Sequence, residues 1–390
     1  MTVRAPASAP AQRHEHDLMR AAHPVAYQAV LRVPAPIRRI PAARVVVVKD
    51  PALVREALTE TERFSKTGPG GSAELWTPMI GPSGLLNMDG DAHRRLRRQL
   101  APLFSPAFAA RLAADALGPL VDEFHAELAA GRRLDVARWA RRLSSTTVSR
   151  LIGFEQTLDD QELFRRASEI TGFASALRRT LRPRQLTKAR AIVAEITAHA
   201  EDAYRRGDEA TVPGRMRALG LELEDMRGVI TALVIAGTET LSSLLPRLTA
   251  ILVDTGWLTR LAADPGLTDA VVAEGLRITT PSPVTLRAVA RETTLGGVPV
   301  RPGDRLLLVT FAANRSAGEL FDPSASPAAS LRQLWFGAGP HFCIGAPLAM
   351  AEIRIGLAAI AAHPGLRIVS ATPSRRVLVP AYRSLEVEDA

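Results

Sequence analysis

The sequence is poor in cysteine and in aromatic residues, and each scarcity excludes a class of protein. A single cysteine, Cys343, among 390 residues rules out an internal disulfide framework and any zinc or iron–sulfur site built from several cysteines. We therefore expect a reducing compartment, the cytoplasm. Aromatic residues make up only 5% of the chain, which removes the base-stacking platform typical of proteins that bind single-stranded nucleic acid.

Long apolar runs are also missing. No run approaches the roughly 18–20 residues of a membrane span, and the first residues lack the apolar stretch of a signal peptide, so we expect no membrane association. The net charge is +9, but the arginines are spread along predicted helices and not gathered into a tail. This distribution favours docking of an acidic protein over binding of nucleic acid.

Most of the chain has the three- and four-residue apolar spacing of helices. The sequence therefore predicts a mainly α fold with a small β-rich part, in one domain over 21–390 that follows a disordered leader over 1–20. Two stretches, 64–90 and 172–182, are predicted to be loops that could cover a pocket. Helices are expected at 50–60, 91–104, 110–130, 134–152, 188–206 and 224–254, and strands at 43–50, 283–290, 303–313 and 366–370.

The only cysteine lies in the stretch FGAGPHFCIG, residues 336–345, at the tip of a glycine-rich turn. The residues alone leave three interpretations open. Cys343 could be a small buried hydrophobic residue, a nucleophile with His341 as its base, or a metal ligand. Turn amides and a following helix N-terminus would stabilise a thiolate, and one thiolate without companion ligands suits a metal already held by a macrocycle.

This stretch resembles the haem-binding loop of the cytochromes P450, F-G-x-G-x-H-x-C-x-G, at every defining position. The resemblance implies the triangular-prism fold of that family and haem b (iron protoporphyrin IX) with Cys343 as axial ligand. It also implies that Phe336 packs beside the sulfur, that Gly337, Gly339 and Gly345 bring the loop close to the haem, and that His341 lies near a propionate.

Three further stretches match motifs of the same family in the same order. VIAGTET resembles the distal-helix motif, in which Ala236 and Gly237 leave room above the iron and Glu239 and Thr240 relay protons during dioxygen activation. From the residues alone, the Thr240 hydroxyl could instead bond back to a carbonyl one turn earlier. HRRLR places His93 and Arg97 where the family binds propionates, and EGLR places Glu274 and Arg277 in the family's structural ion pair, with Arg287 at a further propionate position.

One segment departs from the family's pattern. NRSAGELFDPSASPAASLRQLWF keeps Asn314, Arg315, Phe321, Pro323 and Arg332 but is shortened and lacks the usual Asp-Pro. This departure leaves the structure of the loop over 316–332 open and does not affect the haem-binding residues.

The implied activity is that of a monooxygenase, which uses O2 to hydroxylate or epoxidise a hydrophobic small molecule in natural-product biosynthesis. The sequence has no flavin or nicotinamide motif, so electrons are expected from a ferredoxin or flavodoxin-type donor and its reductase, and Arg94, Arg95 and Arg98 could form the basic docking face. Two alternatives stay open: oxidative coupling or ring formation without oxygen insertion, and a haem-binding protein without turnover.

Overall fold

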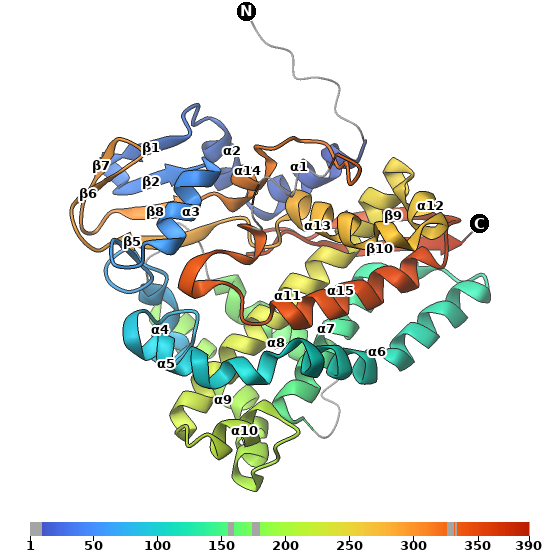
Figure 1. Ribbon diagram of the computed structural model, residues 1–390, viewed down its shortest axis with the longest axis horizontal. Coiled ribbons are helices and arrows are strands. Elements are labelled where there is room, and N and C mark those ends of the chain that lie inside the picture. The colour runs from blue at the N-terminus through green and yellow to red at the C-terminus, as the bar shows by residue number, and fades with distance from the viewer. Residues whose placement is uncertain (1–9, 155–159, 174–179, 326–330, 332–333, 390) are drawn as a thin grey trace, which may run out of the picture.

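The computed structural model describes residues 10–154, 160–173, 180–325, 331 and 334–389. Figure 1 shows a helical part that fills most of a triangular outline, with the larger sheet at one corner and the chain's C-terminal strands at another. The mainly α fold with a small β-rich part, predicted from the sequence, is confirmed.

The longest helix, α11 (Leu223–Thr255), runs through the middle of the molecule (Figure 1). It is long and apolar enough to cross a membrane, but 78% of its apolar window is buried inside the protein. A helix that is apolar on all sides belongs in the core of a large domain, and α11 packs there against α7 (Val136–Ile152) and α15 (Ala346–Ala361). This helix differs from the expectation that no apolar run approaches the length of a membrane span, because Gly237, Glu239 and several threonines interrupt the run in the sequence.

Glycine allows two of these contacts. A Cβ on Gly237 of α11 would lie 2.8 Å from Val148 Cγ2 of α7, and a Cβ on Gly356 of α15 would lie 2.8 Å from Leu245 Cδ1 of α11. These glycines therefore set how closely the three central helices approach.

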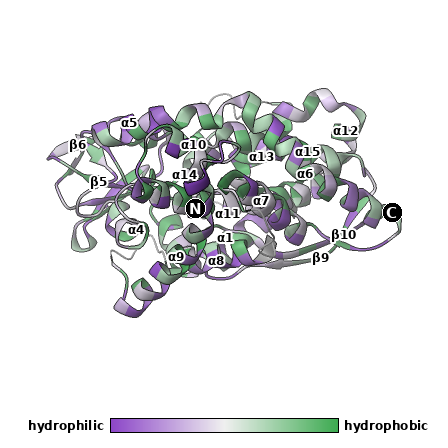
Figure 2. Ribbon diagram, turned by 90° about the horizontal axis from the view of Figure 1, so that it is seen from below, coloured by the Kyte–Doolittle hydropathy of each residue, from purple (hydrophilic) through white to green (hydrophobic). Residues whose placement is uncertain are grey.

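Other helices surround this core, and outer ones such as α5 carry both hydrophilic and hydrophobic residues along their length (Figure 2), as amphipathic surface helices do. The remaining helices are α1 (Pro10–Ala22), α2 (Pro24–Leu31), α3 (Pro51–Thr59), α4 (Ala73–Ile80), α5 (Gly90–Leu100), α6 (Pro106–Ala129), α8 (Asp160–Phe173), α9 (Pro183–Arg206), α10 (Val212–Ala218), α12 (Trp257–Ala263), α13 (Thr268–Thr279) and α14 (Thr310–Arg315).

The largest sheet has five strands in the order β1-β2-β8-β5-β3. Its only parallel pair among the described strands is β2 with β8, in which Val45 faces Arg305 and Val48 faces Leu308. The strands of this sheet are β1 (Ile37–Ile40), β2 (Val45–Val48), β3 (Phe64–Ser65), β5 (Thr285–Val289) and β8 (Arg305–Leu308); the others are β4 (Leu134–Asp135), β6 (Thr293–Leu295), β7 (Val298–Val300), β9 (Leu366–Pro373) and β10 (Tyr382–Asp389).

The first twenty residues differ from the prediction. The part from Pro10 onward, predicted to be leader, forms helix α1, because Glu15 is buried beside Arg247 and Arg315. Arg247 Nε donates to Glu15 Oε1 over 2.9 Å. A buried carboxylate paired with two arginines fixes the helix against the core, and residues 1–9 lie outside the described part of the chain.

Two other local predictions need correction. The stretch 64–90 is not a continuous loop, since it holds strand β3 and helix α4. The predicted strand 303–313 ends at Leu308, and Thr310 begins helix α14. Of the stretch 172–182, residues 174–179 lie outside the described residues.

Candidate active site: a cysteine loop beside a buried basic cluster

The segment 336–345, which we call the cysteine loop, folds back on itself before α15. The Cys343 amide donates to the Phe336 carbonyl over 2.9 Å. Gly337 and Gly339 have φ values of 75° and 65°, a left-handed conformation that favours glycine. A Cβ on Gly339 would also lie 2.9 Å from the Thr59 Cα, so the loop passes directly against the end of α3.

The sulfur of Cys343 is partly enclosed by donors. Burial raises the pKa of the Cys343 thiol, whereas the backbone N–H groups of Gly345 and Ala346 and the charge of Arg97 act in the opposite direction. The side chain is nevertheless exposed on its remaining side. The loop thus presents an open thiol whose deprotonated form would be stabilised by two amides and a nearby cation.

Five basic side chains from four separate segments lie close to this loop, and we call them the basic cluster. Helix α5 places His93 and Arg97 four residues apart on one face, and Arg97 donates to the Phe342 carbonyl. The His93 and His341 rings lie 4.1 Å apart, centre to centre. The cluster consists of Lys66 (directly after β3), His93, Arg97, Arg287 (from β5) and His341.

Two members of the basic cluster, His93 and Arg287, are buried, whereas Lys66, Arg97 and His341 are half-buried. Burial lowers the pKa of Lys66 to about 7 and that of Arg287 to about 10, and in each case Asp89 is the acidic residue that acts against the shift. For Lys66, the charges of Arg287 and Arg97 add to the lowering. Within the described part of the chain, the hydrogen-bond partner of Lys66 Nζ is the Leu85 carbonyl, at 3.5 Å.

The Asp89 carboxylate bonds to the Ser65 hydroxyl, to the backbone amide of Lys66 and to the His341 ring. Its Oδ2 accepts from the Ser65 hydroxyl over 2.6 Å and from the Lys66 amide, and its Oδ1 contacts His341 Nε2 at 2.5 Å. Burial by itself would raise the pKa of Asp89, but the hydrogen bonds from His341 and Ser65 keep it below its ordinary value. Asp89 thereby ties the end of β3 to the cysteine loop and fixes the orientation of the His341 ring.

Two buried nitrogens of the cluster, Arg287 Nε and His341 Nδ1, have no hydrogen-bond partner in the described part of the protein. Arg287 Nε is a donor, and buried donors are normally satisfied, so this site requires an acceptor for it. His341 Nδ1 is instead an acceptor in the neutral ring, because Nε2 then holds the proton that faces Asp89, and burial lowers the pKa of His341 to about 4. Haem would supply two carboxylates for the cluster and an iron for the thiol. The donor set therefore fits the group that the resemblance implies.

Helix α11 supplies the other predicted site residues. Ala236 is exposed although it lies in the middle of a core helix. Thr240 Oγ1 donates to the Ala236 carbonyl over 2.8 Å, the backbone contact that the residues alone left open. The Glu239 carboxylate takes a different direction and accepts from Thr171 of α8 over 2.6 Å. The bare face of Gly237 meets Val148 of α7, so helix packing accounts for this glycine.

The predicted ion pair of EGLR forms in the core and serves the backbone. Arg277 Nε donates to Glu274 Oε2 over 2.7 Å, and the two side chains are 0% and 1% exposed. Arg277 also donates to the carbonyls of Asn314, Gly318 and Leu320, and Glu274 accepts from the Asp322 amide. The pair therefore anchors the first part of the shortened loop, whereas Arg332 lies outside the described residues.

Sequence reasoning missed Lys66, Asp89 and Thr171. Lys66 and Asp89 lie near the two ends of the Gly/Pro-rich stretch 64–90, which the sequence predicts to be a loop. Neither belongs to a pattern of regularly spaced apolar residues. The motifs identified the other four members of the basic cluster, but no local pattern marks Lys66. No local pattern marks Thr171, which is 68 positions from its partner.

Comparisons with known proteins agree with this geometry. The family model described as Cytochrome P450 matches residues 265–363, which include the cysteine loop. The chain is 30% identical to a mycinamicin IV hydroxylase/epoxidase of Micromonospora griseorubida over 75% of both chains. It is 31% identical to the cytochrome P-450 monooxygenase DoxA of Streptomyces peucetius subsp. caesius, over 79% of this chain and 76% of that one.

Solved structures give the same result. A mutant of P450 EryK in complex with erythromycin B superposes with a TM-score of 0.78 at 25% identity, over 98% of each chain. CalO2 superposes with a TM-score of 0.80, over 100% of this chain and 99% of that one, and its 24% identity supports the fold alone. With relatives at 30% and 31% identity over at least three quarters of its length, the chain belongs to the cytochrome P450 family and is a monooxygenase.

Proposed function

We propose that this cytochrome P450 binds haem through Cys343 and inserts one oxygen atom of O2 into a hydrophobic small molecule, as a hydroxylation or an epoxidation in natural-product biosynthesis. The observation that carries the proposal is the open Cys343 thiol beside a cluster of basic side chains in which the buried Arg287 Nε has no hydrogen-bond partner among the described residues. Relatives whose names specify a steroid hydroxylase, a mycinamicin hydroxylase/epoxidase and an erythromycin hydroxylase support the choice of substrate class.

In this proposal, the protein holds haem at two places. Cys343 is the iron ligand. Phe336 accepts the hydrogen bond of the Cys343 amide, Gly337 supplies a left-handed turn, and the Gly345 N–H faces the sulfur. His93, Arg97, Arg287 and His341, joined by Lys66, bind the propionates by charge-assisted hydrogen bonds. When bound, thiolate-ligated haem supplies the activation of O2.

Glu239 and Thr240 handle protons in this scheme. The Thr240 hydroxyl already donates to the Ala236 carbonyl, so its two lone pairs are available to accept a hydrogen bond from a proton-bearing group or water. Burial raises the pKa of Glu239, against the hydrogen bonds from Thr171 and Ser168. A carboxyl with a raised pKa can hold a proton and release it, which a general acid must do.

We propose that the protein works in the cytoplasm and receives its electrons from a separate ferredoxin or flavodoxin-type protein with its reductase. Arg94, Arg95 and Arg98 are exposed on α5, the helix whose buried face carries His93 and Arg97. An acidic donor that docks on this face would therefore lie one helix away from the basic cluster.

The decisive test begins with a library of apolar macrolides and steroids, screened for binders by the shift of the Soret band. Each binder is then turned over with a surrogate ferredoxin, its reductase, NADPH and ¹⁸O2. The proposal predicts a product that gains one labelled oxygen atom. A product that loses two hydrogens and gains no label would instead show oxidative coupling or ring formation.

A further inference from the structure

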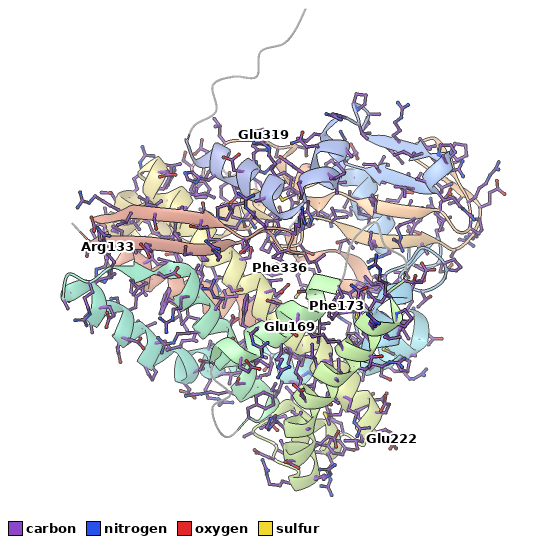
Figure 3. All side chains as sticks on the ribbon, turned by 180° about the vertical axis from the view of Figure 1, so that it is seen from behind. Arg133, Glu169, Phe173, Glu222, Glu319 and Phe336 are labelled. Atoms are coloured by element: carbon purple, nitrogen blue, oxygen red, sulfur yellow. The ribbon has the colours of Figure 1, made fainter. Side chains whose placement is uncertain are left out.

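A hydroxyl on α8 contacts the proposed proton-handling acid. Thr171, two residues before the end of α8, is 2% exposed, and its Oγ1 lies 2.6 Å from Glu239 Oε1 of α11. Glu169 and Phe173, which flank it on the same helix, lie in the central part of the molecule in Figure 3, as does Phe336 of the cysteine loop. Helix α8 thus makes a polar contact with the proposed proton-handling acid of α11.

The Thr171 hydroxyl has a second acceptor within reach. Its Oγ1 lies 3.2 Å from the Ser168 carbonyl of its own helix. One hydroxyl proton cannot serve two acceptors fully, and a hydroxyl can accept as well as donate. When Glu239 is ionised, Thr171 donates to it. When Glu239 is protonated, the Thr171 hydroxyl can donate to the Ser168 carbonyl and accept a hydrogen bond from the carboxyl O–H group.

From this arrangement we propose that Thr171 is a positioning residue of the proton relay, which keeps Glu239 in one place in both of its protonation states. The inference rests on the proposed proton-handling role of Glu239. It adds a residue on a second helix, so that the position of the acid depends on the packing of α8 against α11.

The alternative partner for a buried acid would be a cation, and its effect would be different. A lysine or arginine beside Glu239 would favour the ionised form and lower its pKa, so that proton uptake would require the pair to break. Within the described residues, the groups that act on the Glu239 pKa are the hydroxyls of Thr171 and Ser168, against a background of burial. A hydroxyl partner fixes the Glu239 side chain without adding a positive charge that would lower the pKa of Glu239 further.

The test uses the haem-loaded enzyme and four single variants. Thr171→Val removes the hydroxyl at nearly constant volume, and Thr171→Ser keeps it. Glu239→Gln identifies the carboxyl signal. Thr197→Val is the matched control, because Thr197 on α9 is also 2% exposed and its hydroxyl faces the Val193 and Ala194 carbonyls of its own helix.

The first measurement is infrared difference spectroscopy of the ferric resting enzyme, which does not depend on turnover. We expect the carboxyl C=O band that disappears in Glu239→Gln to shift to higher frequency in Thr171→Val. The band should keep its position in Thr171→Ser and Thr197→Val. An unchanged band in Thr171→Val would overturn the proposed contact.

The second measurement is product and hydrogen peroxide formed per NADPH. We expect Thr171→Val to lower product per NADPH by about tenfold. This loss is smaller than that of the proton donor itself, which typically costs about 10²–10⁴-fold. Thr171→Ser should restore the parent's value. If Glu239→Gln uncouples the enzyme and Thr171→Val does not, the positioning role is wrong and the role of Glu239 stands. If neither variant uncouples it, the proton-handling role of Glu239 is wrong as well.

Discussion

Glu239 and Thr240 are neighbours in the sequence, but their side chains bond to different elements. Glu239 accepts from Thr171 of α8, and Thr240 donates to the Ala236 carbonyl of its own helix. The two groups are therefore fixed independently, one by a contact between helices and the other by a contact within α11. Each can be removed without displacing the other.

Removal of the Thr240 hydroxyl gives the first prediction. In Thr240→Ala, haem content and substrate affinity should stay close to those of the parent, because within the described residues the hydroxyl donates to the Ala236 carbonyl of its own helix. Proton delivery should fail, so reducing equivalents go to hydrogen peroxide and product per NADPH falls by about 10²-fold or more. Product and peroxide, measured together, check this. Unchanged coupling would mean that protons take a route without Thr240.

Lys66 gives the second prediction. Burial lowers its pKa to about 7, so the binding of two propionates should restore its charge and hold the haem more firmly. Lys66→Met should therefore release haem to apomyoglobin faster than the parent, by about tenfold for the loss of one charge-assisted contact of about 1.5 kcal/mol. Lys66→Arg should largely restore retention. Lys49→Met is the control, because Lys49 donates to the Val33 carbonyl, outside the basic cluster. Equal rates for Lys66→Met and the parent would remove Lys66 from the site.

The exposed face of α5 gives the third prediction. Charge reversal at Arg95 or Arg98 should slow reduction by an acidic ferredoxin and leave substrate affinity unchanged. Salt should have the same effect on the parent, because exposed charges are screened beyond about 8–10 Å near physiological ionic strength. Reversal at Arg133, which Figure 3 shows at the edge of the molecule, far from Phe336, should have no effect on the rate. Reduction rates that do not depend on salt would contradict a basic docking face.

A buried acid outside the site gives a prediction about pH. Burial raises the pKa of Glu352 on α15 to about 8, against a hydrogen bond from Thr147. The ordinary pKa of a glutamate is near 4.5. Between pH 4.5 and pH 8, Glu352 is therefore protonated in the folded protein and ionised in the unfolded chain. The free energy of unfolding should fall as the pH rises through this range, by an amount on the order of a few kcal/mol. Glu352→Gln should have a flatter profile of Tm against pH, and parallel profiles for the two proteins would contradict the burial of a protonated acid.

The residues that the sequence identified share a local pattern. Cys343 stands in a long motif, and His93 and Arg97 are four apart on one helix, so their common face follows from helix geometry. The helices with clear periodicity also appear close to where they were predicted.

The features that the sequence did not predict depend on pairs that are distant along the chain. Glu15 and Arg247 are 232 positions apart, and their burial turns an expected leader into helix α1. His341 and Asp89 are separated by 252 positions, and Thr171 and Glu239 by 68. Such partners are brought together only by the packing of the whole domain, and a single sequence has no local signal for them.

The central claim of this account is that Cys343 presents a thiolate to haem iron. The most direct measurement is the absorption spectrum of the reduced carbon-monoxide complex of the purified protein and of Cys343→Ser, with haem content determined for each. Thiolate ligation by Cys343 predicts a strongly red-shifted Soret band for the parent, and either poor haem binding or the loss of that shift in the variant. A variant that binds haem and keeps the red-shifted band would contradict thiolate ligation by Cys343.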